Sequence, residues 1–298
     1  MDQPTHQSAR HRPFKQVDVF TPVPLRGNPL AVVLDATGLS DEEMQRFAAW
    51  TNLSETTFLL PPQNEGADYR VRIFTPGGEL PFAGHPTLGS CHAWLEAGGK
   101  PRGRDVIVQE CKVGLVKLRR EATRRSEQDP ARLAFAAPAL KRGATSPAIL
   151  AQVAAALGLK ANQVIAAQSL DNGPVWLSLL LDRPATVLAL TPDHNQLKSL
   201  GHKVGVAAVY PDADDAGPHL EVRAFAAPAG INEDPVTGSL NASLAQWLIE
   251  DKHMPPRYVA AQGACLGRAG RVHIERDAAG QVWVGGASAT CITGSVAL

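Results

Sequence analysis

The sequence predicts an α+β protein made of two similar halves, each a bent, mainly antiparallel sheet wrapped on one helix. Short β-branched or alternating runs dominate the 298 residues, and helical runs are too few for a doubly wound parallel sheet. Two stretches far apart in the chain also share one residue pattern. A hydrophobic content of 44% leaves ample material for a core in each half.

The expected strands are short and are bounded by Gly, Pro, Asn or Asp, which favour turns. They cover residues 15–20, 29–35, 56–60, 69–74, 105–110, 114–120, 132–135, 174–181, 204–210, 220–225, 271–275 and 281–286.

Three helices have clear start or stop signals. Residues 40–50 open with Ser40 and carry Glu43 at the capping-box spacing. Residues 146–158 begin with Ser-Pro and end at a glycine. Residues 191–201 have the same kind of start and stop signals, beginning with Thr-Pro and ending at a glycine.

Two further helices are expected to form the centres of the two halves. One follows His85 and ends near the glycines at 98–99, and the other follows Asp234. Each is predicted to have proline, Pro86 or Pro235, at its first helical position, where the missing N–H costs nothing. Apolar residues lie around more than one face of both helices, which predicts that each is enclosed by a sheet.

The neighbourhoods of these helices indicate an internal duplication. "YRVRIFTPGGELPFAGHPTLGS" and "LEVRAFAAPAGINEDPVTGS" share V-R-x-F and a later P-x-x-G-S, which aligns His85 with Asp234. The first domain is expected to span 14–125 and the second 126–288, with the boundary in the polar segment 120–131. The last strand, 289–298, is placed so that it can return to the first domain.

A pair of helix N-termini facing each other would form a site for a small anion. Free N–H groups and the positive end of the helix dipole favour a carboxylate there. Two Gly-Ser pairs, Gly89-Ser90 and Gly238-Ser239, suit such a site, because glycine lets a ligand approach the backbone and serine offers a hydroxyl.

Three titratable residues are candidates for the chemistry. Taken alone, Asp234 is better explained as a structural N-cap and His85 as a satisfied turn histidine, but their matched positions favour a functional pair. Glu55, which enters an apolar strand, is by spacing alone a solvent-facing residue. In a site that excludes water, however, its pKa would rise toward neutrality and it could act as an acid or base.

Other site and partner classes lack support. The chain has no phosphate-binding loop, no strand-borne GxGxxG, no HExxH, no GxSxG and no metal-ligand spacing of Cys, His and carboxylates. We therefore expect no metal, nucleotide or flavin cofactor. Basic and acidic residues balance at 29 each, and the basic run 117–125 adjoins acidic residues, so no nucleic-acid partner is expected.

The expected compartment is the cytoplasm, without a membrane association. No apolar run is long enough to span a bilayer, and residues 1–16 lack the apolar core of a signal peptide. The cysteines have no CxxC spacing and are expected to be reduced thiols; they are Cys91, Cys111, Cys265 and Cys291.

Several motifs together resemble the PhzF phenazine-biosynthesis family of isomerases, which have the diaminopimelate-epimerase-like fold. The resemblance runs from Phe14 to the C-terminus and is carried by "VDVFTPVPLRGNPLAVVLD", "NLSETTFLL", "RIFTPGGELPFAGHPTLGS", "NGPVWLSLLL" and "EDPVTGSLNASL". It implies two pseudo-symmetric domains, each a barrel-like, mostly antiparallel sheet around a central helix. It also implies a site between the domains, a homodimer and no cofactor.

The resemblance also assigns roles to residues. The family's enzyme shifts a proton within trans-2,3-dihydro-3-hydroxyanthranilate, and its proton-carrying Glu matches Glu55 in "NLSET". The histidine of "GHP" matches His85, while Asp234 and Ser239 match the family's Asp and Ser. Gly84, Gly89, Ser90, Thr237 and Gly238 are expected to bind the small carboxylate substrate.

Two alternatives remain beside such an isomerase. Racemases and epimerases of this fold use a cysteine at each helix start, but here "FAGHP" and "EDPVTGS" contain none, and Cys91 is expected in the core. The third hypothesis is a non-catalytic protein that binds a small anion. The presence of Glu55, His85 and Asp234 argues against it, because a binder needs no proton acceptor. The run after "TGS" departs from the phenazine enzymes, which leaves the substrate open.

Overall fold

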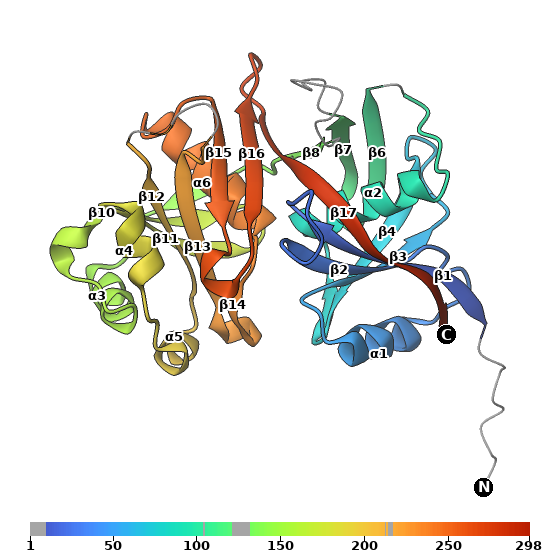
Figure 1. Ribbon diagram of the computed structural model, residues 1–298, viewed down its shortest axis with the longest axis horizontal. Helices are drawn as coiled ribbons and strands as arrows, with labels where there is room; N and C mark the ends of the chain where they lie inside the picture. Colours follow the sequence, from blue (N-terminus) through green and yellow to red (C-terminus); the bar gives the residue numbers. More distant parts are fainter. Residues whose placement is uncertain (1–9, 104, 121–131, 212, 214–216) are drawn as a thin grey trace, which may run out of the picture.

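The computed structural model describes residues 10–103, 105–120, 132–211, 213 and 217–298. It shows two sheet-rich halves side by side, with the second half at the left of Figure 1 and the first at the right. The predicted domain boundary at 125/126 lies outside the described residues. The division into 14–125 and 126–288 therefore stays a prediction.

The first half is a closed eight-stranded barrel. Neighbouring strands pair in the order β1-β2-β3-β4-β6-β7-β8-β17, and β17 pairs back to β1. Closure removes free sheet edges, which would otherwise invite pairing with other chains. The strands are β1 (His11–Val19), β2 (Asn28–Val33), β3 (Thr56–Leu60), β4 (Tyr69–Thr75), β6 (Val106–Cys111), β7 (Gly114–Arg120), β8 (Arg132–Ala136) and β17 (Val282–Ala297).

The second half repeats this pairing pattern. From β10 to β17 the strand pairs are antiparallel, parallel, antiparallel, parallel and twice antiparallel, the same series as from β1 to β8. This repetition confirms the predicted duplication at the level of topology. The strands are β10 (Val164–Asp171), β11 (Val175–Leu181), β12 (Lys203–Val209), β13 (Leu220–Ala226), β15 (Arg257–Gln262) and β16 (Gly270–Arg276). The short β9 (Lys141–Gly143) pairs with β10 and β14 (Ile231–Asp234) with β13, while the short β5 (Gly78–Leu80) pairs with β4 of the first half.

The two halves exchange strands where they meet. Residues Trp283–Ala287 of β17 pair with β8, and from Ser288 onward the same strand pairs with β1. In return, the chain leaving β8 forms β9, which pairs with β10 of the second half. Figure 1 shows β17 running from beside β16 across to β1.

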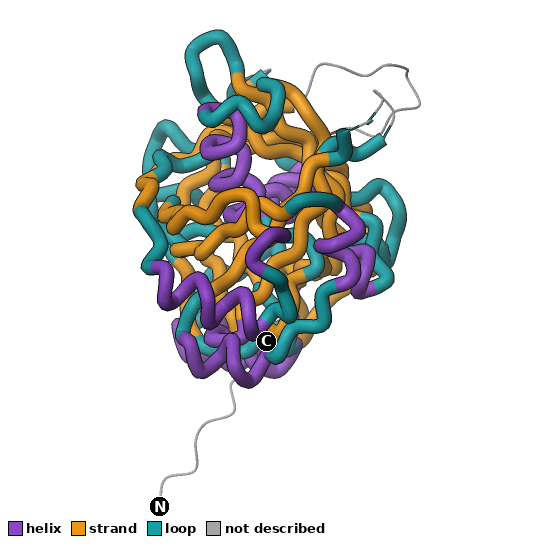
Figure 2. Tube along the Cα trace, turned by 90° about the vertical axis from the view of Figure 1, so that its left-hand side faces the viewer, coloured by secondary structure: helices purple, strands orange, loops and turns teal. Residues whose placement is uncertain are grey.

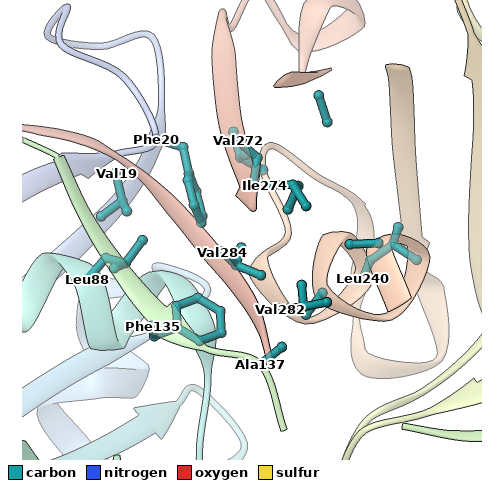
Figure 3. Packing of buried hydrophobic residues seen from close by; sticks show 14 of the residues in the cluster. Val19, Phe20, Leu88, Phe135, Ala137, Leu240, Val272, Ile274, Val282 and Val284 are labelled. Carbon is teal, nitrogen blue, oxygen red and sulfur yellow. The ribbon is translucent and has the colours of Figure 1, made fainter. Parts of the chain in front are cut away.

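Each half encloses a central helix, as predicted. These are α2 (Gly84–Glu96) and α6 (Gly238–Glu250), and most residues of both are buried. A single apolar cluster connects them, with Leu88 of α2 and Leu240 of α6 on opposite sides of Val282 and Val284 (Figure 3). Each such side chain contributes about 1.5–3 kcal/mol by leaving water.

The other helices cover the outer faces of the sheets. Helix α1 (Asp41–Thr51) packs on the first half and has the predicted capping box. Helices α3 (Pro147–Ala156), α4 (Pro184–Ala189) and α5 (His194–Leu200) pack on the second half, on the side that faces the viewer in Figure 2. Short 3₁₀ turns occupy 161–163, 227–229 and 264–266. Among the described residues, no helix is long and apolar enough to cross a membrane.

The predicted helix starts were wrong in detail. Helix α6 begins at Gly238 rather than after Asp234, because Asp234 ends strand β14 and Thr237 is the N-cap. Helix α2 begins at Gly84, so Pro86 is its third residue rather than its first. Strands β5, β9, β10, β14 and β15 and helix α4 were not predicted.

Candidate active site

The N-termini of the two central helices meet at Gly84 and Gly238. A Cβ atom added to Gly84 would lie 3.1 Å from the Gly238 Cα, and one added to Gly238 would lie 3.0 Å from the Gly84 Cα. Such contacts are tighter than nine in ten real Cβ contacts, and a Cβ on Gly84 would also lie 2.7 Å from the Phe135 ring, so glycine is strongly favoured at both positions. The close approach brings two helix N-termini, with their free N–H groups, to one point.

Glu55 and His85 face each other beside this point. Glu55 immediately precedes β3, and His85 is the second residue of α2. The distance from His85 Nε2 to Glu55 Oε2 is 3.5 Å, and the side chains are 5% and 14% exposed. Neither atom has a hydrogen-bond partner among the described residues, although both are buried. Buried polar atoms are normally paired, so this pair points to a ligand.

Asp234, which belongs to the second half, lies at the same helix junction, and each oxygen of its carboxylate accepts a hydrogen bond. Asn28, the first residue of β2, donates from Nδ2 to Asp234 Oδ1 at 2.9 Å and to the Val236 carbonyl at 2.9 Å. The Thr237 hydroxyl donates to Asp234 Oδ2 at 2.6 Å. His85 Nδ1 lies 3.4 Å from the same Asn28 nitrogen. Asn28 therefore links the carboxylate of one half to the histidine of the other.

Gln262, at the end of β15, holds the segment before α6 in place. Its side chain accepts from the Thr237 backbone N–H at 3.0 Å and donates to the Asp234 carbonyl at 3.0 Å. Asn241 donates to the Gln262 Oε1 at 2.9 Å. Both amide side chains are 1% exposed, so these bonds fix the local backbone firmly.

Ser239, the second residue of α6, is held by two groups from the β10–β11 hairpin. Trp176 donates from its indole Nε1 to the Ser239 hydroxyl at 3.2 Å. Asn172 donates to the Ser239 carbonyl at 2.9 Å. The hydroxyl of Ser239 thus has a defined position near the junction of the two helices.

Burial dominates the protonation of the three titratable groups. It raises the pKa of Glu55 to about 8, helped by the charge of Asp234 and opposed by Ser54 and Lys203. It raises the pKa of Asp234 to about 6, against hydrogen bonds from Thr237 and Asn28. Burial lowers the pKa of His85 to about 3, so its imidazole is neutral near pH 7.

The predicted residues are not all brought together. Glu55, His85, Asp234, Ser239, Gly84, Thr237 and Gly238 converge at the helix junction. Gly89 instead packs against Leu30 and Val19, and Ser90 donates to the Thr57 hydroxyl within the barrel. The structure therefore gives Gly89 and Ser90 no contact at the helix junction: the sequence repeat aligns Gly89 with Gly238, whereas Gly84 is the residue that lies against Gly238. A substrate-binding role for Gly89 and Ser90 stays a prediction.

The capping alternative for Asp234 is wrong. The N-cap of α6 is Thr237, Asp234 lies four residues before the first helical residue, Gly238, and its carboxylate accepts from the Asn28 and Thr237 side chains. Cys91 is in the core as predicted: it is fully buried, and burial raises the pKa of its thiol to about 12. All four cysteines are unpaired. No cluster of three or more His, Cys, Asp or Glu able to hold a metal ion occurs in the described part of the chain.

Sequence reasoning missed several residues of the site. Asn28 lies within the family-like stretch "RGNPLAVV", where an asparagine before proline at a strand start was a usable signal. Gln262, Trp176 and Asn172 lie in or beside ordinary strands, and no local pattern marks them. Lys203, whose charge acts on both Glu55 and Asp234, begins β12 in an equally unmarked position.

Solved structures with the same architecture define the class of the protein: it has the two-domain fold shared by PhzF proteins and proline-racemase-like epimerases. A PhzF-family protein of Bacillus anthracis superposes with a TM-score of 0.83 at 24% identity, covering 97% of this chain and 100% of that one. A predicted epimerase of Pseudomonas aeruginosa gives 0.77 at 28%, covering 96% and 99%. A hydroxyproline epimerase of Agrobacterium vitis gives 0.60 at 14%, covering 97% and 93%, and shows the fold alone.

The chain belongs to the family described as phenazine biosynthesis-like protein (PhzC-PhzF), which matches residues 17–294. It is 35% identical to trans-2,3-dihydro-3-hydroxyanthranilate isomerase of P. aeruginosa, over 91% of this chain and 92% of the relative. It is 38% identical to antisense-enhancing sequence 1 of Schizosaccharomyces pombe, over 94% and 97%. An uncharacterized isomerase of Deinococcus radiodurans is 34% identical, over 93% and 92%. The protein is an isomerase of this family.

Proposed function

We propose that the protein moves a proton within a small carboxylate substrate, without a cofactor, using Glu55 as the general acid and base. The observation that supports this most is the buried pair Glu55 Oε2 and His85 Nε2. The two atoms lie 3.5 Å apart and have no hydrogen-bond partner among the described residues. A substrate placed between the two helix N-termini would supply the missing partners.

The proposed step balances within the substrate. The Glu55 carboxylate takes a proton from a carbon made acidic by conjugation, and the C–H electron pair spreads into the conjugated system. A new C–H bond then forms at another carbon, with the proton that Glu55 returns. No oxidant or reductant is consumed. A pKa of about 8 suits this double duty, because such a group gains and loses a proton readily near neutrality.

The surrounding groups would bind and orient the substrate. Neutral His85 offers a hydrogen bond to a polar substituent, and the Ser239 hydroxyl offers another. The N–H groups at the start of α2 and α6, near Gly84 and Gly238, would hold the substrate's carboxylate, whereas the Thr237 N–H already donates to Gln262. Asp234 has both oxygens bound already, so we assign it the positioning of Asn28 and Thr237 rather than proton transfer.

The substrate class follows from the relatives. One of them is named trans-2,3-dihydro-3-hydroxyanthranilate isomerase. We propose a substrate of that kind, a cyclic diene with a carboxylate, for this chain. A homodimer is part of the same proposal, and light scattering on the purified protein would check it.

Proton exchange with heavy water tests the proposal. A panel of small carboxylates that includes trans-2,3-dihydro-3-hydroxyanthranilate is incubated in deuterium oxide and read by mass spectrometry. We expect the wild type to introduce deuterium into a true substrate. Glu55→Gln should abolish that exchange while still binding the substrate. The exposed Glu65→Gln is the matched control and should behave as wild type. Unchanged exchange in Glu55→Gln would refute the assignment.

The alternative of a two-thiol racemase has no support at the site. Its nearest thiol, Cys91, is buried in the core with a raised pKa, so it forms little thiolate. The same heavy-water experiment separates the two reactions, because a racemase yields the mirror image of its substrate and an isomerase yields a constitutional isomer.

A further inference from the structure

Asn28 lies at the centre of the polar contacts around the helix junction. It is the first residue of β2 and is completely buried. Its side-chain nitrogen, Nδ2, is 2.9 Å from Asp234 Oδ1, 2.9 Å from the Val236 carbonyl oxygen and 3.4 Å from His85 Nδ1. One amide nitrogen therefore faces two oxygens of the second half and one ring nitrogen of the first.

The neighbours of Asn28 determine which end of its amide faces His85. The Val236 carbonyl oxygen can only accept a hydrogen bond, so the group 2.9 Å from it is the NH₂ of Asn28 and not its oxygen. The amide oxygen lies on the other side, where the Ser54 hydroxyl donates to it at 3.4 Å. A flipped amide would bring oxygen against oxygen, so the hydrogens of the NH₂ group are the ones that point toward the imidazole.

An NH₂ group opposite Nδ1 determines where the neutral imidazole of His85 carries its proton. A neutral imidazole has one N–H and one nitrogen with a free lone pair. A proton on Nδ1 would meet the hydrogens of Asn28, and Nδ1 has no other partner among the described residues. Nδ1 therefore keeps its lone pair, and the proton lies on Nε2, the nitrogen 3.5 Å from Glu55 Oε2. Burial lowers the pKa of His85 to about 3, which disfavours a second proton.

The position of this proton decides how many bases the site contains. In the other tautomer, the lone pair of Nε2 would face Glu55 and the bound substrate, and the imidazole would be a second base beside the carboxylate. With the proton on Nε2, His85 donates a hydrogen bond and has no lone pair on that side. The tautomer of His85 thus separates the donor of the site from its base.

We propose that Asn28 is a positioning residue that holds His85 in the Nε2–H tautomer, so that His85 donates a hydrogen bond and Glu55 alone takes the substrate's proton. This inference rests on the proposed function, because it concerns the division of roles within the same site. The bonds from Asn28 to Asp234 and Val236 would by themselves only join the two halves. The contact with Nδ1 goes further, because it acts through the ring on the nitrogen that faces Glu55.

Nitrogen-15 NMR of histidine-labelled protein tests the tautomer without any substrate. A protonated ring nitrogen and one with a free lone pair have well-separated chemical shifts, and His85→Asn identifies the signals of His85 among the nine histidines. For the wild type near pH 7 we expect the proton on Nε2. In Asn28→Asp an oxygen replaces the NH₂ group, so we expect a proton on Nδ1. In Asn28→Ala the amide is absent, so we expect both tautomers.

Deuterium exchange into the substrate measures the consequence for the reaction. In Asn28→Asp we expect kcat for exchange to fall about 10-fold to 100-fold while KM changes by less than about threefold, because the substrate still binds but meets a misplaced donor. Asn195→Asp makes the same chemical change at an exposed position of α5. It should leave both the tautomer of His85 and the exchange rate as in the wild type.

The outcomes separate positioning from a purely structural role. A proton on Nδ1 in the wild type, or the wild-type tautomer in both Asn28 variants, would overturn the proposal, even if exchange is lost. The wild-type spectrum alone can overturn it, so the test holds where a variant does not fold. The proposed proton transfer is judged separately, because exchange retained in Glu55→Gln would reject it and leave the tautomer, measured without substrate, as it is.

Discussion

The two halves of the molecule each bring a carboxyl group to the helix junction, and they treat it differently. Glu55 of the first half has a buried oxygen without a hydrogen-bond partner, and its pKa is raised to about 8. Asp234 of the second half has each oxygen bound, one by Asn28 and one by Thr237, and its pKa rises only to about 6. Burial raises both pKa values, but at Glu55 the charge of Asp234 adds to it, whereas at Asp234 the hydrogen bonds from Thr237 and Asn28 oppose it.

This contrast shows how the two copies of a duplicated fold can give equivalent carboxyl groups different roles. The strand pairing of the halves is the same, yet one carboxyl group is free to exchange a proton and the other is fixed as a support. A group that must gain and lose a proton cannot be tied by donors that favour one charge state. The surroundings of each carboxyl group, rather than its residue type, therefore assign its role.

The largest expected effect is that of Glu55→Gln. Glutamine keeps the size of the side chain but cannot accept and return a proton, so deuterium exchange into the substrate should fall by about 10³-fold or more. Mass spectrometry of the exchanged product measures it. Retention of a tenth of the wild-type exchange would place the proton transfer on another residue.

Asp234→Asn should have a smaller effect, about 10-fold to 10²-fold on kcat. The amide still accepts from Asn28 but presents a donor to the Thr237 hydroxyl, so it disturbs positioning and leaves proton transfer in place. Steady-state kinetics checks this. If kcat falls as far in Asp234→Asn as it does in Glu55→Gln, both carboxyl groups take part in the proton transfer, and the contrast between them is refuted.

The pH profile of the exchange rate should follow Glu55. The group must be ionised to act as a base, so the rate should rise about tenfold per pH unit below about pH 8 and level off above it. Rates measured from pH 5.5 to 9.5 locate the midpoint. A midpoint near pH 4.5, the ordinary value, would show that Glu55 is solvated in solution.

Stability should respond to pH in the opposite directions at Glu55 and His85. The pKa of Glu55 is raised in the folded state, so its contribution to stability is present below about pH 4.5 and is lost as the pH rises through about 8. The pKa of His85 is lowered, so its contribution is present above pH 6.5 and is lost as the pH falls through about 3. Thermal melts of wild type, Glu55→Gln and His85→Asn would separate the two. Identical pH dependence in all three would contradict both shifts.

Trp176→Phe should have the smallest effect. Phenylalanine retains most of the packing but removes the indole N–H that donates to the Ser239 hydroxyl. Loss of one neutral hydrogen bond corresponds to about 0.5–1.5 kcal/mol, or about threefold to tenfold in kcat/KM. A change beyond 10²-fold would indicate that Trp176 contacts the substrate itself.

The sequence predicted the halves, the central helices and most of the residues that converge. The halves and the central helices follow from local patterns, such as alternating strands and helical spacing around Leu88 and Leu240. Glu55 does not, because its spacing alone predicts a solvent-facing residue, and the family resemblance placed it at the site. The register of the repeat was not predictable, because Gly84 and Gly238 are aligned by their backbone contact and not by their motifs. Gln262 and Lys203 were missed because their partners come from distant strands, and no local signal encodes such contacts. Asn28 did have a local signal, the asparagine before proline at the start of a strand, but its partners likewise come from distant segments.

The exchange of strands between the halves has a consequence for how the chain folds. Residues from Ser288 onward close the first barrel, although they follow the whole second half in the sequence. During synthesis the first half therefore remains an open sheet, with unpaired edges at β1 and β8, until these residues have emerged. The first half is thus no early folding unit of its own, because its barrel closes only after the second half has been made.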